Sequence, residues 1–454
     1  MVEEVRDVKK SGFTLIELMV AMVVGLTAIT SAYSLGAAMS RQFYEEQRTA
    51  TSQGVSRVAI MELRRDISRA GLFGSPNGSL EPTCDTSLPE LPTLGGSPGP
   101  MGAFQYYADE DLAILDPDGV NTGVSADRLR VLTSLYLTDQ LLVHSTSIDG
   151  ATIVLSTGNQ AYRRTFAWGQ TAGPFNSGSA PTYLDGNLDW KSAWASETAS
   201  WKGIAQKGAR AFQTGSVLHI ETPEGRHFFR SVFGKGGNTQ DEVHIQVSPV
   251  LPVGTACLPG AAESSTIAPL QWVEYAIVDP FDATEVGADF MDFEGMFYID
   301  LDPANPSFDL QGTTASDLLE SPNRVLVRRV LDSITGNVRP NSTQVIAEFV
   351  GHFRVSFLLD SNSGDSTVGA SISANMVTGS SAQTTINASP QQVRSVIIEL
   401  GIRNPVEDPG MTSSFNVVDA GITRFDVDKD QTGYARVRNM RIEIPVMNVA
   451  RRNL

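Results

Sequence analysis

The chain has 454 residues, of which 41% are hydrophobic, and its 51 acidic residues outnumber its 34 lysines and arginines to give a formal net charge of −17. This composition is typical of a water-soluble globular protein, and the length allows more than one domain. Phosphate groups repel so acidic a chain, which excludes nucleic acid and anionic membrane surfaces as its main partners. The charge fits either an acidic binding face or the solubility of an exported protein.

The first predicted element is an apolar helix. From Phe13 to Ser40 every residue except Glu17 is apolar, small or hydroxylic. The run exceeds the roughly 20 residues that a helix needs to cross a bilayer. Lys9 and Lys10 precede it, and basic residues stay on the cytoplasmic side of a membrane. We therefore expect the N-terminus inside and the bulk of the chain outside.

Three kinds of N-terminal segment fit this run. A secretory signal peptide would be cut after small residues, such as those at 34–36 or 36–38. An ordinary anchor helix would stay uncut. Neither gives Glu17 a role, because a carboxylate in the middle of a bilayer costs about 2.5–3.5 kcal/mol. The third kind comes from a resemblance: residues 11–17, with the sequence SGFTLIE, resemble the leader and helix start of type IV pilins and pseudopilins.

This resemblance implies a processing site. A prepilin peptidase would cleave between Gly12 and Phe13 at the cytoplasmic face and then N-methylate Phe13. The new amine would lie about one helical turn before Glu17. The resemblance also implies that Glu17 faces the terminal amine of a neighbouring subunit when helices bundle into a filament, because a buried charge is tolerable only when it is paired. The alternative for Glu17 is a side chain that reaches back to the cytoplasmic interface.

A second, polar half of the helix is predicted over residues 41–71. It contains no proline, and Val55, Val58 and Ile67 follow a partial three-to-four spacing that predicts an amphipathic helix packed on a domain. Gly71, which follows several basic residues, predicts the end of the helix. The sequence LRRDISRAGLFG, at 63–74, resembles the end of this helix in the PilW family of minor pilins.

The two cysteines, Cys84 and Cys257, form no CxxC pair and have no metal-ligand spacing. If the bulk of the chain is exported, they predict one disulfide, worth about 5 kcal/mol in the chain-entropy model; two free thiols are the alternative. Cys84 lies in a loop rich in proline and glycine, 74–103, which also holds a formal G-x-S-x-G match at 95–99. A proline follows the serine of that match and no apolar strand precedes it, so we do not interpret the serine as a nucleophile.

Alternating apolar and polar residues predict strands in the rest of the chain. The clearest are at 353–359, 396–402 and 440–446, each with one face on a core and one mostly toward solvent, as in an antiparallel sheet. Further strands are predicted at 216–222, 242–250 and 271–279. The order of the C-terminal strands again resembles PilW-type chains.

Little in the sequence indicates catalysis. Five histidines are scattered without zinc spacing, and no phosphate-binding glycine loop stands out, so we predict that the protein is not an enzyme. Trp190, Trp194 and Trp201 are spaced so that a helix would place them on one face. Such a stripe fits either a platform that binds a sugar or a surface, or a part of the core.

One acidic motif raises the question of calcium. Asp426, Asp428 and Asp430 alternate as at the start of an EF-hand loop, but Gln431 stands where the glycine belongs and Val437 where the closing acid belongs. The motif fits a weak calcium site or an acidic turn between strands. No other cofactor is expected.

Taken together, these features predict an α+β, pilin-like fold: a long N-terminal helix, half in the membrane and half amphipathic, packed on a large, mainly antiparallel β head. The expected segments in chain order are a leader at 1–12, the transmembrane half of the helix at 13–40, its soluble half at 41–71, a large β-rich inserted head region at 72–270, and a C-terminal antiparallel β region at 271–454.

The predicted function is that of a minor type IV pilin of the PilW type. The resemblance implies that prepilin peptidase and other minor and major pilins are its partners, and that it resides in the inner membrane before it joins a pilus at the cell surface. It would prime pilus assembly or sit at the pilus tip. Two alternatives stay open: a minor pseudopilin of a type II secretion system, and a tip adhesin that binds a surface or sugar through its head.

Overall fold

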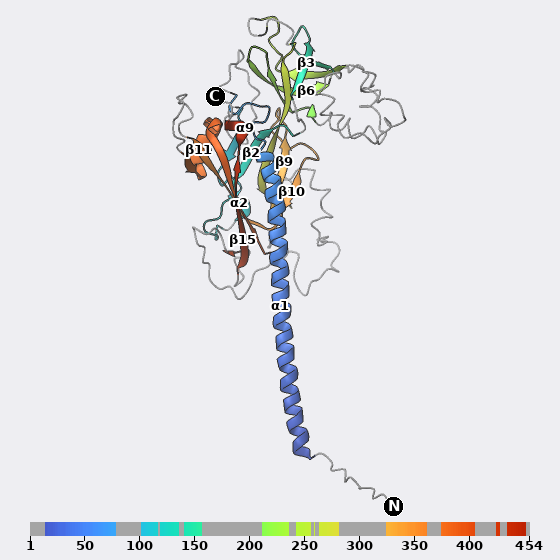
Figure 1. Cartoon of the computed structure of the whole chain (residues 1–454), viewed down its shortest axis with the longest axis vertical. Coiled ribbons are helices and arrows are strands. Elements are labelled where there is room, and N and C mark those ends of the chain that lie inside the picture. Colours follow the sequence, from blue (N-terminus) through green and yellow to red (C-terminus); the bar gives the residue numbers. More distant parts are fainter. Residues whose placement is uncertain are drawn as a thin grey trace, which may run out of the picture. The chain divides into compact units, whose positions relative to one another are not determined.

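The computed structural model describes residues 14–78, 101–116, 119–135, 140–156, 211–235, 242–255, 258, 263–280, 324–360, 374–404, 424–426 and 434–450. The chain divides into two compact units, residues 1–54 and 55–454. A long N-terminal helix precedes a large, mostly antiparallel β region, which confirms the predicted fold class (Figure 1). The finer segment boundaries predicted above stay predictions.

Helix α1 (Leu15–Ile67) has 53 residues and crosses the boundary between the units. Its bounds lie within four residues of the predicted ones. The stretch Leu15–Gly36 has 22 residues and a mean hydropathy of 2.0, so it is long and apolar enough to cross a membrane. Most of its large apolar side chains are exposed, Leu15 to 80% and Tyr33 to 79%. Over Leu15–Gly36, therefore, α1 is an apolar helix whose described side chains are not packed in a core.

In unit 2 the same helix is amphipathic, as predicted, but Val58, which was expected on the packed face, is 53% exposed. Ala59, Leu63 and Ile67, spaced by four residues, are fully buried in the main core. The helix ends just before Gly71, which has a φ of +68°, a conformation that favours glycine. The Gly71 N–H then donates to the carbonyl of Leu132, so the chain leaves the helix directly onto the sheet.

A five-stranded antiparallel sheet packs on this buried helix face. Its strand order is β12-β11-β13-β15-β14. The bounds are β11 (Val350–Asp360), β12 (Ala374–Val377), β13 (Val393–Arg403), β14 (Arg424–Phe425) and β15 (Ala435–Pro445). The register places Phe353 opposite Leu400 and Val355 opposite Ile398, and all four side chains lie in the core cluster of Leu63. The three C-terminal strands predicted from alternation are confirmed.

The second face of this sheet differs from the prediction that it would lie mostly toward solvent. Ser356 and Ile397 on this face are buried, and Arg354 is only 34% exposed. One cause is a preceding stretch that bridges the edge of β11 at Phe353 and contacts side chains of this face: the Ser125 N–H donates to His352 Nδ1 at 3.0 Å, and Arg354 Nε donates to Ser125 Oγ at 3.1 Å.

The other sheet has ten strands, listed here with their bounds: β1 (Phe104–Tyr107), β2 (Arg128–Thr133), β3 (Leu141–Thr146), β4 (Thr152–Ser156), β5 (Val217–Glu221), β6 (His227–Lys235), β7 (Glu242–Ser248), β8 (Thr266–Val278), β9 (Val325–Leu331) and β10 (Gln344–Ala347). The predicted strands at 216–222, 242–250 and 271–279 correspond to β5, β7 and β8.

Strand β8, with 13 residues, organises this sheet. Its first part pairs with β3 on one side and with β5 on the other, so that the pairing β8-β3-β4-β7-β6-β5-β8 closes into a small antiparallel barrel. Its second part pairs with β2 and β9 and forms the middle of an open sheet with β1 and β10. Apolar residues at alternate positions fill the barrel, among them Leu218, Ile220, Val243 and Ile245.

Short helices cover the edges of the sheets: α2 (Leu112–Leu115), α8 (Gly379–Ala388), the 3-10 helix η4 (Pro390–Gln392) and α9 (Met447–Ala450). Helix α8 lies on β1, where the Asn387 side chain makes two hydrogen bonds with the backbone of Tyr106. The Tyr106 N–H donates to Asn387 Oδ1 at 2.8 Å, and Asn387 Nδ2 donates to the Tyr106 carbonyl at 2.9 Å. This contact joins two segments almost 300 residues apart in the sequence.

Candidate functional site

The start of α1 is closed by two side chains that bond each other's backbone. The N–H and the Oγ1 hydroxyl of Thr14 both donate to Glu17 Oε2 at 2.9 Å. The Glu17 N–H in turn lies 3.3 Å from Thr14 Oγ1. This is a capping box, in which a threonine at the N-cap and a glutamate three residues later satisfy two of the free N–H groups of a helix start.

Glu17 therefore has a role within its own chain, in addition to the role implied by resemblance. Its Oε2 atom is held by Thr14, while its Oε1 atom has no hydrogen-bond partner among the residues that the structure describes. A carboxylate also gains from the positive end of the helix dipole at this position. The free oxygen can accept a bond from a cationic group such as an amine.

A shallow hollow lies beside Glu17 on the surface of α1. Its lining residues are Ile16, Glu17, Val20, Ala21, Val24 and Gly25. Ala21 and Gly25 follow Glu17 at intervals of four, so all three lie on one helix face. A Cβ atom built on Gly25 would meet no atom within 4 Å, so this face is open. Small residues at this spacing allow another helix in a membrane to approach closely.

The other predicted site residues are placed only in part. Gly12, Phe13, Cys84, Cys257, Asp428 and Asp430 lie outside the described residues, as do the three tryptophans and the G-x-S-x-G match. Asp426 is described, and its backbone is tied to Asn121: its N–H donates to Asn121 Oδ1 at 2.7 Å. Within the described ranges no three His, Cys, Asp or Glu side chains gather as metal ligands. Disulfide and calcium site both stay predictions.

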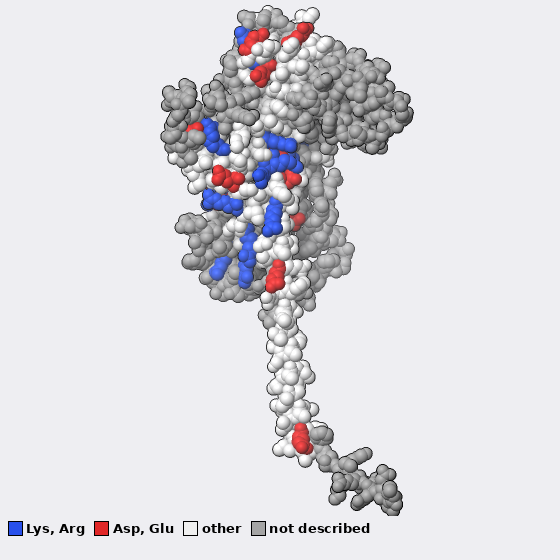
Figure 2. Space-filling view, viewed as in Figure 1, with Lys and Arg blue, Asp and Glu red and all other residues white. Residues whose placement is uncertain are grey.

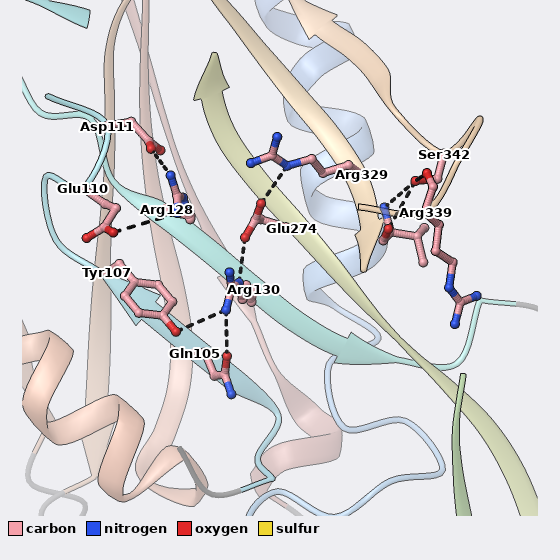
Figure 3. Close-up of polar contacts among 11 residues, drawn as sticks. Gln105, Tyr107, Glu110, Asp111, Arg128, Arg130, Glu274, Arg329, Arg339 and Ser342 are labelled. Atoms are coloured by element: carbon pink, nitrogen blue, oxygen red, sulfur yellow. Dashed lines mark hydrogen bonds and ion pairs between the residues drawn. The ribbon is translucent and has the colours of Figure 1, made fainter. Parts of the chain in front are cut away.

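A buried polar ladder that the sequence did not indicate crosses β1, β2, β8 and β9 (Figure 3). The register places Gln105, Arg130, Glu274 and Arg329 side by side on one face. Arg130 Nε donates to Glu274 Oε2 at 2.6 Å, and Arg329 Nε donates to Oε1 at 2.7 Å. Burial opposes the ionisation of Glu274, but Arg329, Arg130 and Arg128 outweigh it and lower its pKa to about 2. The ladder is a set of cross-strand ion pairs that fixes the strand register.

The comparison with known families agrees with the N-terminal geometry. The family described as "Prokaryotic N-terminal methylation motif" matches residues 8–33, a range that contains Thr14, Glu17 and the start of the apolar helix. The chain thus carries the leader motif of type IV pilin-like proteins, which are structural subunits of type IV pili and of related pseudopili. No curated protein and no solved structure matches the chain.

The match confirms the resemblance to type IV pilins and pseudopilins that residues 11–17 indicated. Together with the apolar helix Leu15–Gly36, it fits a pilin-like protein anchored in the inner membrane. It implies processing by prepilin peptidase and assembly with other pilins. The assignment to PilW stays a prediction, because the matched residues end at position 33.

Proposed function

We propose that this chain is a minor type IV pilin of the PilW type. Prepilin peptidase cleaves between Gly12 and Phe13, methylates the new terminus at Phe13, and releases a subunit that enters a pilus through its N-terminal helix. The observation that carries this proposal is the methylation motif over residues 8–33, which leads directly into an exposed apolar helix with Glu17 at its start.

Glu17 supplies the selectivity of the assembly step. One carboxylate oxygen is already used by Thr14, and the other accepts a hydrogen bond from the terminal amine of a neighbouring subunit. An ion pair inside the membrane replaces an unpaired carboxylate, so insertion beside another subunit is favoured over insertion into lipid. The small face of Ala21 and Gly25 lets the two helices come close enough for this pair to form.

Before assembly the subunit resides in the inner membrane, with its N-terminus in the cytoplasm and unit 2 in the periplasm. It then joins other minor and major pilins to prime the filament or to occupy its tip. Unit 2, which spans residues 55–454, supports a tip position, because a bulky head would crowd its neighbours along a shaft. A pseudopilus of a type II secretion system would use the same leader and helix.

The test uses strains that carry each variant as the only copy of the gene. Gly12→Leu should block cleavage, seen as an unprocessed N-terminus by mass spectrometry. Glu17→Ala should be cleaved and methylated, yet give few surface pili and little twitching. Normal piliation with both variants would overturn the assembly role. A loss of protein secretion with intact pili would instead assign the chain to a pseudopilus.

A further inference from the structure

The outward face of α1 in unit 2 carries exposed arginines around two exposed apolar side chains. Val58 is 53% exposed and Met61 is 62% exposed, and Arg57 and Arg64 on the same face are exposed as well. Arg57 and Val58 precede Met61 by four and three residues, and Arg64 follows it by three; these four residues are named the basic stripe. They lie opposite the buried face of Ala59, Leu63 and Ile67.

Neither Arg57 nor Arg64 has an ion-pair partner in the described part of the chain, whereas the adjacent Arg65 binds Glu62 at 2.6 Å. Figure 2 shows basic side chains gathered over this part of unit 2. In a chain with a net charge of −17, uncompensated arginines next to exposed Met and Val have the composition of an interface core.

One end of the barrel has the opposite charge. Glu221, the last residue of β5, pairs with Thr266, the first residue of β8, and Glu224 and Glu263 each lie three residues beyond that pair. Both glutamates are exposed, and neither has an ion-pair partner among the described residues. Glu224 and Glu263 are named the acidic end. Arg226, in the same turn as Glu224, is only partly exposed.

We propose that the basic stripe of one copy docks on the acidic end of a second copy of this chain. A second copy is favoured as the occupant because its charge is known from the sequence and is strongly acidic. A contact between two different patches of identical chains is heterologous, the kind that builds rings or filaments. The contact lies wholly within unit 2 and goes beyond the proposed function, which rests on the N-terminal helix.

The chemistry of the two patches is complementary. Arg57 and Arg64 present guanidinium groups that bind carboxylates in a bidentate manner, and Glu224 and Glu263 present carboxylates that no other side chain uses. Val58 and Met61 provide the apolar centre. The net charge of each copy opposes association, but at 0.15 M salt repulsion beyond about 8 Å is largely screened while contacting pairs are not.

The test measures self-association of the full chain in detergent micelles at 0.15 M salt by sedimentation velocity. The stripe variant is Arg57→Glu with Arg64→Glu, and the end variant is Glu224→Arg with Glu263→Arg. Each alone should raise the dissociation constant at least about tenfold, because like charges then face each other across the contact. An equimolar mixture should associate again, since the acidic stripe of one variant meets the basic end of the other.

Control variants separate this contact from other causes. Arg424→Glu with Glu348→Arg alters charge elsewhere in unit 2 and should associate like the unaltered chain. The milder Arg57→Gln with Arg64→Gln should weaken association less than the charge reversal. Circular dichroism checks that every variant is folded, and recovery in the mixture is a second proof that both reversed variants are folded.

Three results would overturn the proposal. The first is unaltered association of both reversed variants, and the second is a mixture that associates no better than each variant alone. The third is a stripe variant that associates normally but loses binding to duplex DNA or to vesicles with anionic phosphatidylglycerol. That last result would assign the stripe to a phosphate-bearing partner instead of a second copy.

Discussion

The attachment of α1 to the sheet gives the most direct stability prediction. Asp66, in the last turn of the helix, is fully buried and accepts hydrogen bonds from side chains of two strands. The Tyr275 hydroxyl of β8 donates to Asp66 Oδ2 at 2.9 Å, and Arg328 Nε of β9 donates to the same oxygen at 2.6 Å. We expect Asp66→Ala to destabilise unit 2 strongly.

The magnitude follows from what the substitution leaves behind. Arg328 is only 8% exposed, so without Asp66 its charge stays buried with no counter-charge at that site. Removing one partner of a buried ion pair costs about 3–5 kcal/mol. The fully buried Tyr275 loses its acceptor as well, a loss that costs about 1–3 kcal/mol when it occurs alone. Because both groups share one carboxylate, the two costs do not simply add.

The assay is urea unfolding of the full chain in detergent, followed by circular dichroism. Glu62→Ala is the matched control on the same helix: it removes one of the two partners of Arg65, whose side chain is 46% exposed and also binds Asp66, and should cost less than about 1 kcal/mol. Tyr275→Phe removes only the hydroxyl and should fall between the two. If Asp66→Ala costs no more than Glu62→Ala, the reasoning from burial and pairing is wrong.

Three further predictions concern buried charges in unit 2, each measured as the free energy of unfolding in urea. Glu274→Gln should cost about 3–5 kcal/mol, because it removes the charged partner of the buried Arg130 and one acceptor of Arg329. A cost near zero would contradict the ladder. Burial raises the pKa of Asp127 from 3.8 to about 6, so the stability that its protonated form contributes is complete below pH 3.8 and is lost as pH rises through about 6. Asp127→Asn should remove up to about 3 kcal/mol of this pH dependence, and an unchanged pH profile of stability would refute the prediction. Burial lowers the pKa of His352, and its Nδ1 accepts a hydrogen bond from the Ser125 N–H at 3.0 Å, so the free energy of unfolding should fall as pH drops below 6.5. His352→Gln should make this fall shallower, and an equally steep pH profile would contradict the prediction.

The elements that sequence predicted well share one physical feature, a core on a single face. The strands around Val355 and Ile398 alternate because one face meets α1, and α1 itself shows its buried face at every fourth residue. Such local periodicity is visible in one sequence. Contacts with a distant segment leave no such periodicity. The expectation for the second face of that sheet was therefore wrong: Ser125, more than 200 residues away in the sequence, hydrogen-bonds His352 on that face.

The closure of the barrel was not predictable from such patterns. The sequence indicated a strand only from residue 271, because Pro269 is a residue that normally marks an edge or an end of a strand. In the structure β8 begins at Thr266 and carries Pro269 opposite Leu218. Its partners on the two sides are β3 and β5, which lie far apart in the sequence, so the ring depends on contacts that no local pattern encodes.

At the N-terminus the sequence indicated Glu17 but not its partner. The stretch from Thr14 to Glu17 has the spacing of a capping box, and that signal was present in the sequence. The resemblance to pilin leaders concerns only contacts between subunits, not this bond within the helix. The hydrogen bonds to Thr14 show that part of the carboxylate is satisfied within its own helix.

This partial satisfaction changes the energetics expected of a lone subunit. A bare carboxylate in a bilayer would be costly enough to oppose insertion of the helix itself. With Oε2 held by the N–H and hydroxyl of Thr14, and with the helix dipole acting on the same group, the lone helix is easier to keep in a membrane. The remaining oxygen lacks a partner among the described residues, so under the proposed function it can still favour pairing with a neighbouring amine. If that pairing forms, Glu17 stabilises both states: the lone subunit through the capping box, and the assembled subunit through the added ion pair.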